Sequence, residues 1–222
     1  MPEPTVVIVD YALGNLYSIH HACTRAGLAP VITSDRTQIL QADAVLLPGM
    51  GAFGDAMRTL RQLDLVEVLR DVAASGRPLI GICLGIQLLL SESHEFGTHR
   101  GLDIIAGSVV RLDKPRVGDK MLKVPQIGWN QINPARPWKA TLLDGVPAGE
   151  YMYFVHSYVP CPDDDGVVLS YTDYGGVKFC SCIQKDNIFA CLFHPERSAK
   201  MGLKIYQNLA GLIRQSMEGN HR

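Results

Sequence analysis

The sequence predicts an α/β fold: a doubly wound, mostly parallel central sheet flanked by helices, with an additional antiparallel strand region in the C-terminal half. Three observations support this prediction. Short apolar runs alternate with segments of helical periodicity between residues 5 and 82, as in parallel sheets covered on both faces. One of these runs turns into a helix through a Gly-x-Cys-x-Gly pattern. After residue 95, closely spaced strand patterns follow, which favours antiparallel pairing.

Each strand of the first half is predicted by a short apolar run. The runs cover residues 5–9, 30–32, 44–47 and 79–82. Apolar residues recur at helical spacing from 16 to 26, and again from 57 to 73, where one or two helices end before Gly76. Ligands of such sheets bind at the carboxyl ends of the strands.

The second half carries the predicted antiparallel strands. Strand patterns cover residues 101–111, 167–172, 177–183 and 188–193. The segment 117–138 is rich in Gly, Pro and Asn and is predicted to be irregular. Apolar residues from 201 to 213 predict an amphipathic closing helix. We expect residues 1–222 to form a single domain.

Composition excludes several classes of protein. A net charge of -1 gives no electrostatic footprint for nucleic acid or an anionic membrane. No apolar run approaches the roughly 20 residues of a transmembrane helix, and the N-terminal residues lack the basic region of a signal peptide. Six scattered cysteines indicate a reduced, cytoplasmic protein. Cys180 and Cys182 are too close for the usual zinc-ligand spacing, so we expect no metal site. We also expect no cofactor.

A cysteine stands at the sharpest predicted turn of the chain. The motif GICLGIQ at 81–87 places Cys83 between Gly81 and Gly85, where the strand 79–82 passes into a helix. This is the nucleophile-elbow pattern with cysteine in place of serine. The helix N-terminus favours the thiolate and offers a free backbone N–H to a developing oxyanion. A buried cysteine that only ends a core strand would give the same pattern.

A glycine-rich turn, GMGAFG at 49–54, follows the preceding strand and fits the dinucleotide fingerprint Gly-x-Gly-x-x-Gly. Three features argue against dinucleotide binding. The turn follows the third strand, it contains Pro48, and the next strand ends in Cys83 instead of an acidic residue. The backbone N–H groups of this turn can instead supply a second oxyanion donor. Because glycines tolerate peptide rotation, the turn could also act as a switch.

A thiol nucleophile needs a base, and the base needs a group that orients it. His194 follows the strand 188–193 and opens the sequence HPER. Glu196 comes two residues later, where its carboxylate can hold the imidazole and stabilise the imidazolium form. His156 lies in an apolar aromatic run, YFVHSY at 153–158.

These motifs resemble the signature of the class I (triad) glutamine amidotransferases. GICLGIQ (81–87) and HPE (194–196) carry this resemblance, which extends through nearly the whole chain. Four further segments are similar to one subfamily, the glutaminase subunits of imidazole glycerol phosphate synthase. They are DYALGNL at 10–16, LPGMGAF at 47–53, PQIGWN at 125–130 and YFVHSY at 153–158. Ala12 departs from an expected glycine, and Arg197 from an expected lysine whose charge it keeps.

The resemblance implies which residues form the site. Cys83 would attack the side-chain amide of glutamine and form a γ-glutamyl thioester, His194 would transfer the protons, and Glu196 would orient His194. Oxyanion donors would be the N–H of Leu84 and one from Gly49, Met50 or Gly51. Candidates for holding the amino-acid end of glutamine are Gly85, Gln87, Glu95, His156, Ser157 and Tyr158.

The resemblance also implies a partner, because we find no second domain that could accept ammonia. The partner would be a cyclase subunit, a (β/α)8 barrel, that forms a heterodimer with this chain and receives ammonia through an internal passage. It would produce imidazole glycerol phosphate and aminoimidazole carboxamide ribotide in histidine biosynthesis. Candidates for the interface or the passage mouth are Asn15, Trp129, Tyr153 and Arg197. Two alternatives stay open: a paralogue that supplies ammonia to a nucleotide-linked sugar, and a non-catalytic α/β binding module.

Overall fold

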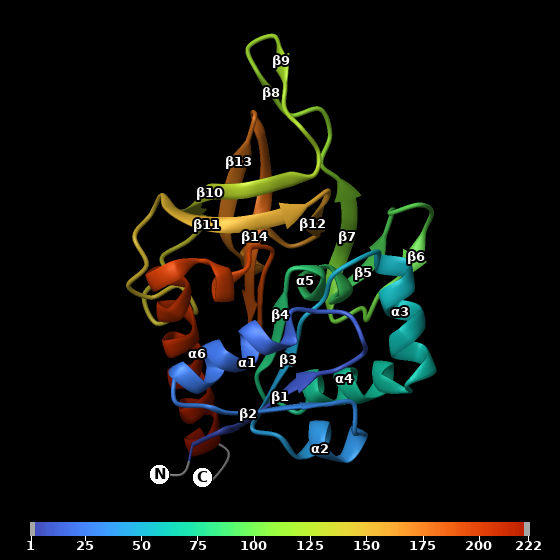
Figure 1. Ribbon diagram of the computed structural model, residues 1–222, viewed down its shortest axis with the longest axis vertical. Coiled ribbons are helices and arrows are strands. Elements are labelled where there is room, and N and C mark those ends of the chain that lie inside the picture. Colours follow the sequence, from blue (N-terminus) through green and yellow to red (C-terminus); the bar gives the residue numbers. More distant parts are fainter. Residues whose placement is uncertain (1–2, 220–222) are drawn as a thin grey trace.

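The computed structural model describes residues 3–219 and is built around a nine-stranded sheet (Figure 1). The strands of the first half are β1 (Thr5–Val9), β2 (Ala29–Thr33), β3 (Ala44–Leu47), β4 (Leu79–Ile82), β5 (Leu90–Ser93), β6 (His99–Arg100) and β7 (Ile105–Arg111). Those of the second half are β8 (Arg116–Val117), β9 (Lys120–Met121), β10 (Gln126–Pro134), β11 (Glu150–His156), β12 (Tyr158–Pro162), β13 (Val168–Tyr174), β14 (Val177–Lys185) and β15 (Ile188–Cys191). The helices are α1 (Leu16–Arg25), α2 (Arg36–Gln41), α3 (Phe53–Gln62), α4 (Leu65–Ala74), α5 (Leu84–Leu88) and α6 (Ala199–Gly219), with short 3-10 turns at Asp165–Val167 and Pro195–Arg197.

The nine strands run in the order β11-β10-β13-β14-β15-β4-β3-β1-β2, so that the sheet has a parallel half and an antiparallel half. Strands β2, β1, β3, β4 and β15 pair in parallel. Every residue of β3 and β4 is buried, as their unbroken apolar runs predicted. Helices α1 and α6 contact each other, and α4 contacts both α2 and α3. The predicted α/β class with a helix-flanked sheet is confirmed.

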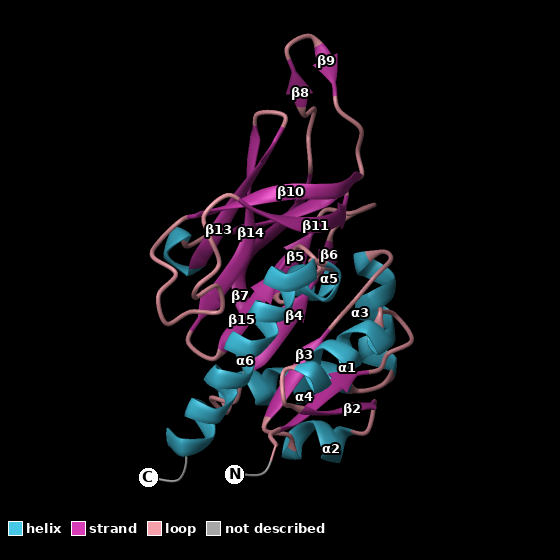
Figure 2. Cartoon of the chain, turned by 60° about the vertical axis from the view of Figure 1, so that its left-hand side comes forward, coloured by secondary structure: helices cyan, strands magenta, loops and turns pink. Residues whose placement is uncertain are grey.

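The predicted strands 167–172, 177–183 and 188–193 are confirmed as β13, β14 and β15, which continue the same sheet, whereas the predicted strand 101–111 begins at Ile105 and belongs, as β7, to a smaller sheet. β14 pairs antiparallel with β15 and β13, and β10 pairs antiparallel with β13 and β11. A smaller sheet has the order β12-β7-β5-β6. The β8–β9 hairpin projects from the end of the molecule opposite α2 (Figure 2).

One prediction about local structure was wrong. The segment 117–138, predicted to be irregular, contains the nine-residue strand β10. The glycine and asparagines of β10 are tolerated because β10 pairs with β11 from Gln126 to Ile132, so that cross-strand pairing outweighs composition. The predicted helix after Cys83 ends at Leu88, and Leu90 pairs with Ile105 in the smaller sheet. Within residues 3–219, no helix is both long and apolar enough to cross a bilayer.

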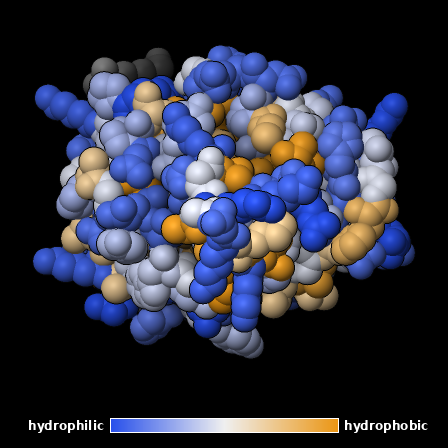
Figure 3. Space-filling model, turned by 90° about the horizontal axis from the view of Figure 1, so that it is seen from above, coloured by the Kyte–Doolittle hydropathy of each residue, from blue (hydrophilic) through white to orange (hydrophobic). Residues whose placement is uncertain are grey.

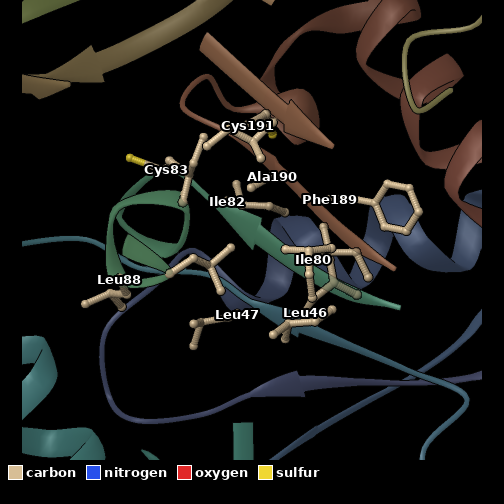
Figure 4. Close-up of a cluster of buried hydrophobic side chains, with 14 of the residues drawn as sticks. Leu46, Leu47, Ile80, Ile82, Cys83, Leu88, Phe189, Ala190 and Cys191 are labelled. Carbon is tan, nitrogen blue, oxygen red and sulfur yellow. The ribbon is translucent and has the colours of Figure 1, made fainter. Parts of the chain in front are cut away.

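The turn between β4 and α5 is possible only because two glycines allow close packing. A Cβ at Gly85 would lie 1.9 Å from the Leu47 carbonyl oxygen, and one at Gly81 would lie 2.8 Å from the Gly85 backbone. Between them the backbone of Cys83 adopts φ 56° and ψ -111°, a conformation that residues other than glycine rarely take. Cys83 therefore stands at the end of β4, at the edge of the buried cluster around Leu47 and Ile82 (Figure 4).

We expect Gly85→Ala to destabilise the protein by about 3 kcal/mol or more, because the added methyl group overlaps the Leu47 carbonyl and the packed turn has no room to relax. The control is Gly211→Ala in α6, where no atom lies within 4 Å of the new methyl group. That change should be neutral or stabilise by up to about 1 kcal/mol. Urea unfolding of both variants measures the difference, and equal free energies of unfolding would contradict the packing argument.

Candidate active site

One pocket of about 340 Å³ collects most of the predicted site residues at the carboxyl ends of the parallel strands. The predicted residues that line it are Asn15, Gly49, Met50, Gly51, Cys83, Leu84, Gln87, Glu95, His156, Ser157, Tyr158, His194 and Arg197. Four predicted residues do not line it: Gly85, Trp129, Tyr153 and Glu196. Pro125 and Val155 complete the lining and were not predicted.

The thiol of Cys83 is the nucleophile candidate in this pocket. Cys83 is only 8% exposed, so a ligand reaches its thiol through the pocket. The Cys83 thiol donates a weak hydrogen bond to the Val155 carbonyl, with 3.8 Å between sulfur and oxygen. β11 thus approaches the elbow from the antiparallel half of the sheet.

His194 and Glu196 form a buried pair beside Cys83. His194 Nδ1–H donates to Glu196 Oε1 at 2.8 Å, which leaves Nε2 for the thiol. Burial lowers the pKa of His194, but hydrogen bonds with Cys83 and Glu196, together with their negative charges, outweigh burial and raise it to about 10. The arrangement therefore keeps a proton on His194 at neutral pH, beside the Cys83 side chain.

The backbone around His194 is fixed by contacts with β11. The His194 N–H donates to the Tyr153 carbonyl at 2.8 Å. The hydroxyl of Ser198 donates to the His194 carbonyl at 2.6 Å and accepts from the Tyr153 N–H at 3.0 Å. Sequence reasoning missed Ser198, whose place just before the closing helix is typical of capping residues and gave the only signal.

Backbone donors surround the pocket near Cys83. In the described part of the chain, no acceptor lies within hydrogen-bond distance of the N–H groups of Gly49, Met50, Gly51 or Leu84. Leu84 is the first residue of α5, so the partial positive charge of a helix N-terminus adds to its own N–H. These donors can stabilise negative charge that develops on an oxygen in the pocket.

Three side chains predicted to hold the amino-acid end of a substrate already contact protein groups. Gln87 Nε2 donates to the Tyr158 carbonyl at 3.2 Å, and Glu95 Oε2 accepts from the Phe53 N–H at the start of α3, at 2.6 Å. The ring nitrogens of His156 lie 3.1 Å from the Tyr158 carbonyl oxygen and 3.0 Å from the Gln126 side-chain amide. Burial lowers the pKa of His156 to about 4, so this ring is neutral at physiological pH.

An exposed aromatic surface adjoins the pocket on β10 and β11. Trp129 is 53% exposed and packs edge-on against Tyr153, with 5.9 Å between ring centroids. The Arg197 guanidinium lies 5.2 Å from the centroid of the Tyr153 ring. Ile127 and Tyr151, both more than half exposed, lie on the same face by strand register and were not predicted. We call these four β-strand residues, Ile127, Trp129, Tyr151 and Tyr153, the β10–β11 face. Seen from the β8–β9 end, the surface has apolar patches among hydrophilic side chains (Figure 3).

Comparison with known proteins places this geometry in a family. Residues 7–209 match the family model "Glutamine amidotransferase class-I". The HisH subunit of imidazole glycerol phosphate synthase from Syntrophotalea carbinolica is 46% identical over 93% of this chain and 100% of its own length. The HisH subunit from Aquifex aeolicus is 45% identical over 91% of this chain and 94% of its own.

Solved structures share the fold at low sequence identity. PurLQS from Thermotoga maritima superposes with a TM-score of 0.71 at 17% identity, covering 95% of this chain and 99% of the other. The glutaminase domain of Trypanosoma brucei CTPS gives a TM-score of 0.63 at 14% identity, covering 94% of each chain. The chain therefore belongs to the glutamine amidotransferase class-I family, together with the HisH subunits of imidazole glycerol phosphate synthase that it matches over nearly its whole length.

Proposed function

We propose that this chain hydrolyses glutamine to glutamate and ammonia as the glutaminase subunit of an imidazole glycerol phosphate synthase. One observation supports this function above the others. Cys83 and His194 line one pocket, because they stand at the ends of the neighbouring strands β4 and β15. Glu196 accepts a hydrogen bond from the His194 ring and so orients it. The sequence similarity to HisH subunits supports the same assignment.

The proposed reaction needs only the residues of this pocket. The Cys83 thiolate attacks the side-chain carbonyl carbon of glutamine, and the proton held on His194 passes to the departing nitrogen, which leaves as ammonia. The remaining γ-glutamyl thioester is attacked by water, whose proton returns to His194. Glutamate then leaves and the thiolate is restored. Glu196 keeps the imidazole oriented and stabilises its positive charge through both steps.

The tetrahedral intermediates place negative charge on the former carbonyl oxygen. The N–H of Leu84 is one proposed donor, and one of the free N–H groups of the loop 49–51 is the other. The amino-acid end of glutamine would lie toward Gln87, Glu95, Ser157 and Tyr158, which line the far part of the same pocket. Gly85, which does not line the pocket, permits the close turn, and the neutral His156 ring, which lines the pocket, lies within hydrogen-bond distance of the Tyr158 carbonyl.

The proposed partner is a cyclase subunit with a (β/α)8 barrel, forming a heterodimer that uses the ammonia to make imidazole glycerol phosphate and aminoimidazole carboxamide ribotide for histidine biosynthesis. We place it over the pocket mouth, where Asn15 and Arg197 lie beside the β10–β11 face. Aromatic side chains more than half exposed at such a site are typical of interface anchors. All six cysteines are free, which fits a reducing cytoplasm.

We expect Cys83→Ser to lower glutaminase kcat by at least about 1,000-fold, because an alcohol at this position is a far weaker nucleophile than a thiolate. The assay measures glutamate release by the chain mixed with its cyclase partner. The matched control, Cys161→Ser, makes the same change at an exposed free cysteine and should keep full activity. Retention of activity in Cys83→Ser would disprove the proposed chemistry.

The pKa of His194 predicts the alkaline limit of activity. Since a protonated His194 donates to the leaving ammonia, kcat/KM should fall as the pH rises through about 10. Glu196 contributes to the high pKa of His194, so Glu196→Gln should lower that pKa and move the alkaline limb to lower pH. Glutaminase pH profiles of both proteins test this sign, and a limb that moved to higher pH would refute it.

We expect Trp129→Ala to weaken binding of the cyclase subunit by about 30-fold, because it removes a large exposed aromatic anchor next to Tyr153. Leu40→Ala serves as the control, since Leu40 is also exposed but lies on α2 at the opposite end of the molecule (Figure 1). Calorimetric titration of the two subunits gives both affinities. An equal loss of affinity in the two variants would show that the β10–β11 face is not part of the interface.

A further inference from the structure

Tyr11 is a buried tyrosine that the proposed chemistry does not use. It lies just after Asp10 at the end of β1, which pairs with β3, and it is 1% exposed. Its hydroxyl donates to the Pro48 carbonyl, with 2.6 Å between the oxygens. Pro48 follows β3 and precedes the loop 49–51, so this hydrogen bond reaches the backbone at the point where the loop begins.

The Tyr11 hydroxyl also lies against Gly49. A Cβ built on Gly49 would lie 2.4 Å from the Tyr11 oxygen, a distance at which the two atoms overlap. The Pro48 carbonyl and the Gly49 N–H belong to one planar peptide unit and point in opposite directions. Fixing the carbonyl on Tyr11 therefore fixes the direction of the Gly49 N–H, which has no acceptor in the described part of the protein.

The other side of Pro48 is held as well. A Cβ on Gly14 would lie 3.3 Å from Pro48 Cγ, so the segment after Tyr11 packs closely on the proline ring. Proline already restricts its own φ angle. Pro48 therefore has little freedom to rotate, and the free rotations begin only after Gly49.

Tyr11 is a permanent hydrogen-bond donor. Burial raises its pKa far above the ordinary value, and the nearby charge of Cys83 raises it further. The hydroxyl keeps its proton throughout the pH range of the enzyme. Tyr11 does not line the pocket.

We propose that Tyr11 is a positioning residue for glutamine hydrolysis, because its hydroxyl anchors the Pro48–Gly49 peptide and so aims the Gly49 N–H, the first backbone donor of the loop 49–51, at the developing oxyanion. This role rests on the proposed glutaminase function. Tyr11 touches neither the substrate nor the reacting atoms. Its effect is confined to steps that place negative charge on the substrate oxygen.

The test is Tyr11→Phe, which removes one oxygen and leaves the ring in the core. We expect kcat for glutamine hydrolysis, measured with the cyclase partner bound, to fall about 10-fold to 100-fold, with KM changed less than twofold. In the same samples, the rate at which iodoacetamide alkylates Cys83 should stay within twofold of wild type. Alkylation displaces iodide at a saturated carbon and forms no oxyanion, so a fall in kcat with an unchanged alkylation rate reports on the loop and not on the reactivity of Cys83.

The control is Tyr171→Phe, which removes a hydroxyl that donates to Asp165 away from the pocket, and its kcat should equal that of wild type. An unchanged kcat in Tyr11→Phe, or equal falls in kcat and in alkylation rate, would overturn the positioning role while leaving the glutaminase function standing. A wild-type complex that releases no glutamate would instead overturn the proposed function, and the role of Tyr11 with it.

Discussion

The contact between Gly85 and the Leu47 carbonyl is the constraint on which the rest of the site depends. It brings the first turn of α5 against the end of β3, which no residue with a Cβ would allow. The elbow then holds Cys83 in a left-handed conformation that an isolated chain would avoid. Because packing against the neighbouring strands fixes this turn, the folding free energy of the parallel core offsets the backbone strain at Cys83.

The same contact explains why donors from two separate loops surround one sulfur. β3 and β4 are adjacent parallel strands, so the loop 49–51 and the start of α5 leave the sheet at the same edge. The parallel half thereby supplies Cys83 and the free N–H groups. β15, parallel to β4 on its other side, supplies His194, and the antiparallel strand β11 fixes the His194 backbone through the Tyr153 carbonyl. The mixed sheet is thus a requirement of the site.

Sequence patterns predicted the parts of this fold that are fully buried. β3 and β4 were predicted to the residue because uninterrupted apolar runs between turn residues have few other interpretations. β10 was missed because much of it faces solvent and its pairing depends on β11, a strand that was not predicted either. Cys83 was predicted as a site residue because Gly81 and Gly85 flank it, and His194 because Pro195 follows it at the end of a strand. Tyr11 and Ser198 gave no periodic signal, since each acts through hydrogen bonds between its hydroxyl and the backbone.

The electrostatics of the pair His194–Glu196 depend on groups that stay neutral around it. Cys23, Cys191 and Tyr206 lie near Glu196. Burial is the largest cause that raises the pKa of each, and the charge of Glu196 raises it further, after Cys182 in the case of Cys191. None of them therefore carries a negative charge at neutral pH. The carboxylate side chain of Glu196 is itself shielded from solvent, so its field is little screened and acts mainly on His194. Together with Cys83, a buried carboxylate surrounded by neutral, weakly polar side chains is what lets the imidazole keep its proton until a leaving group needs it.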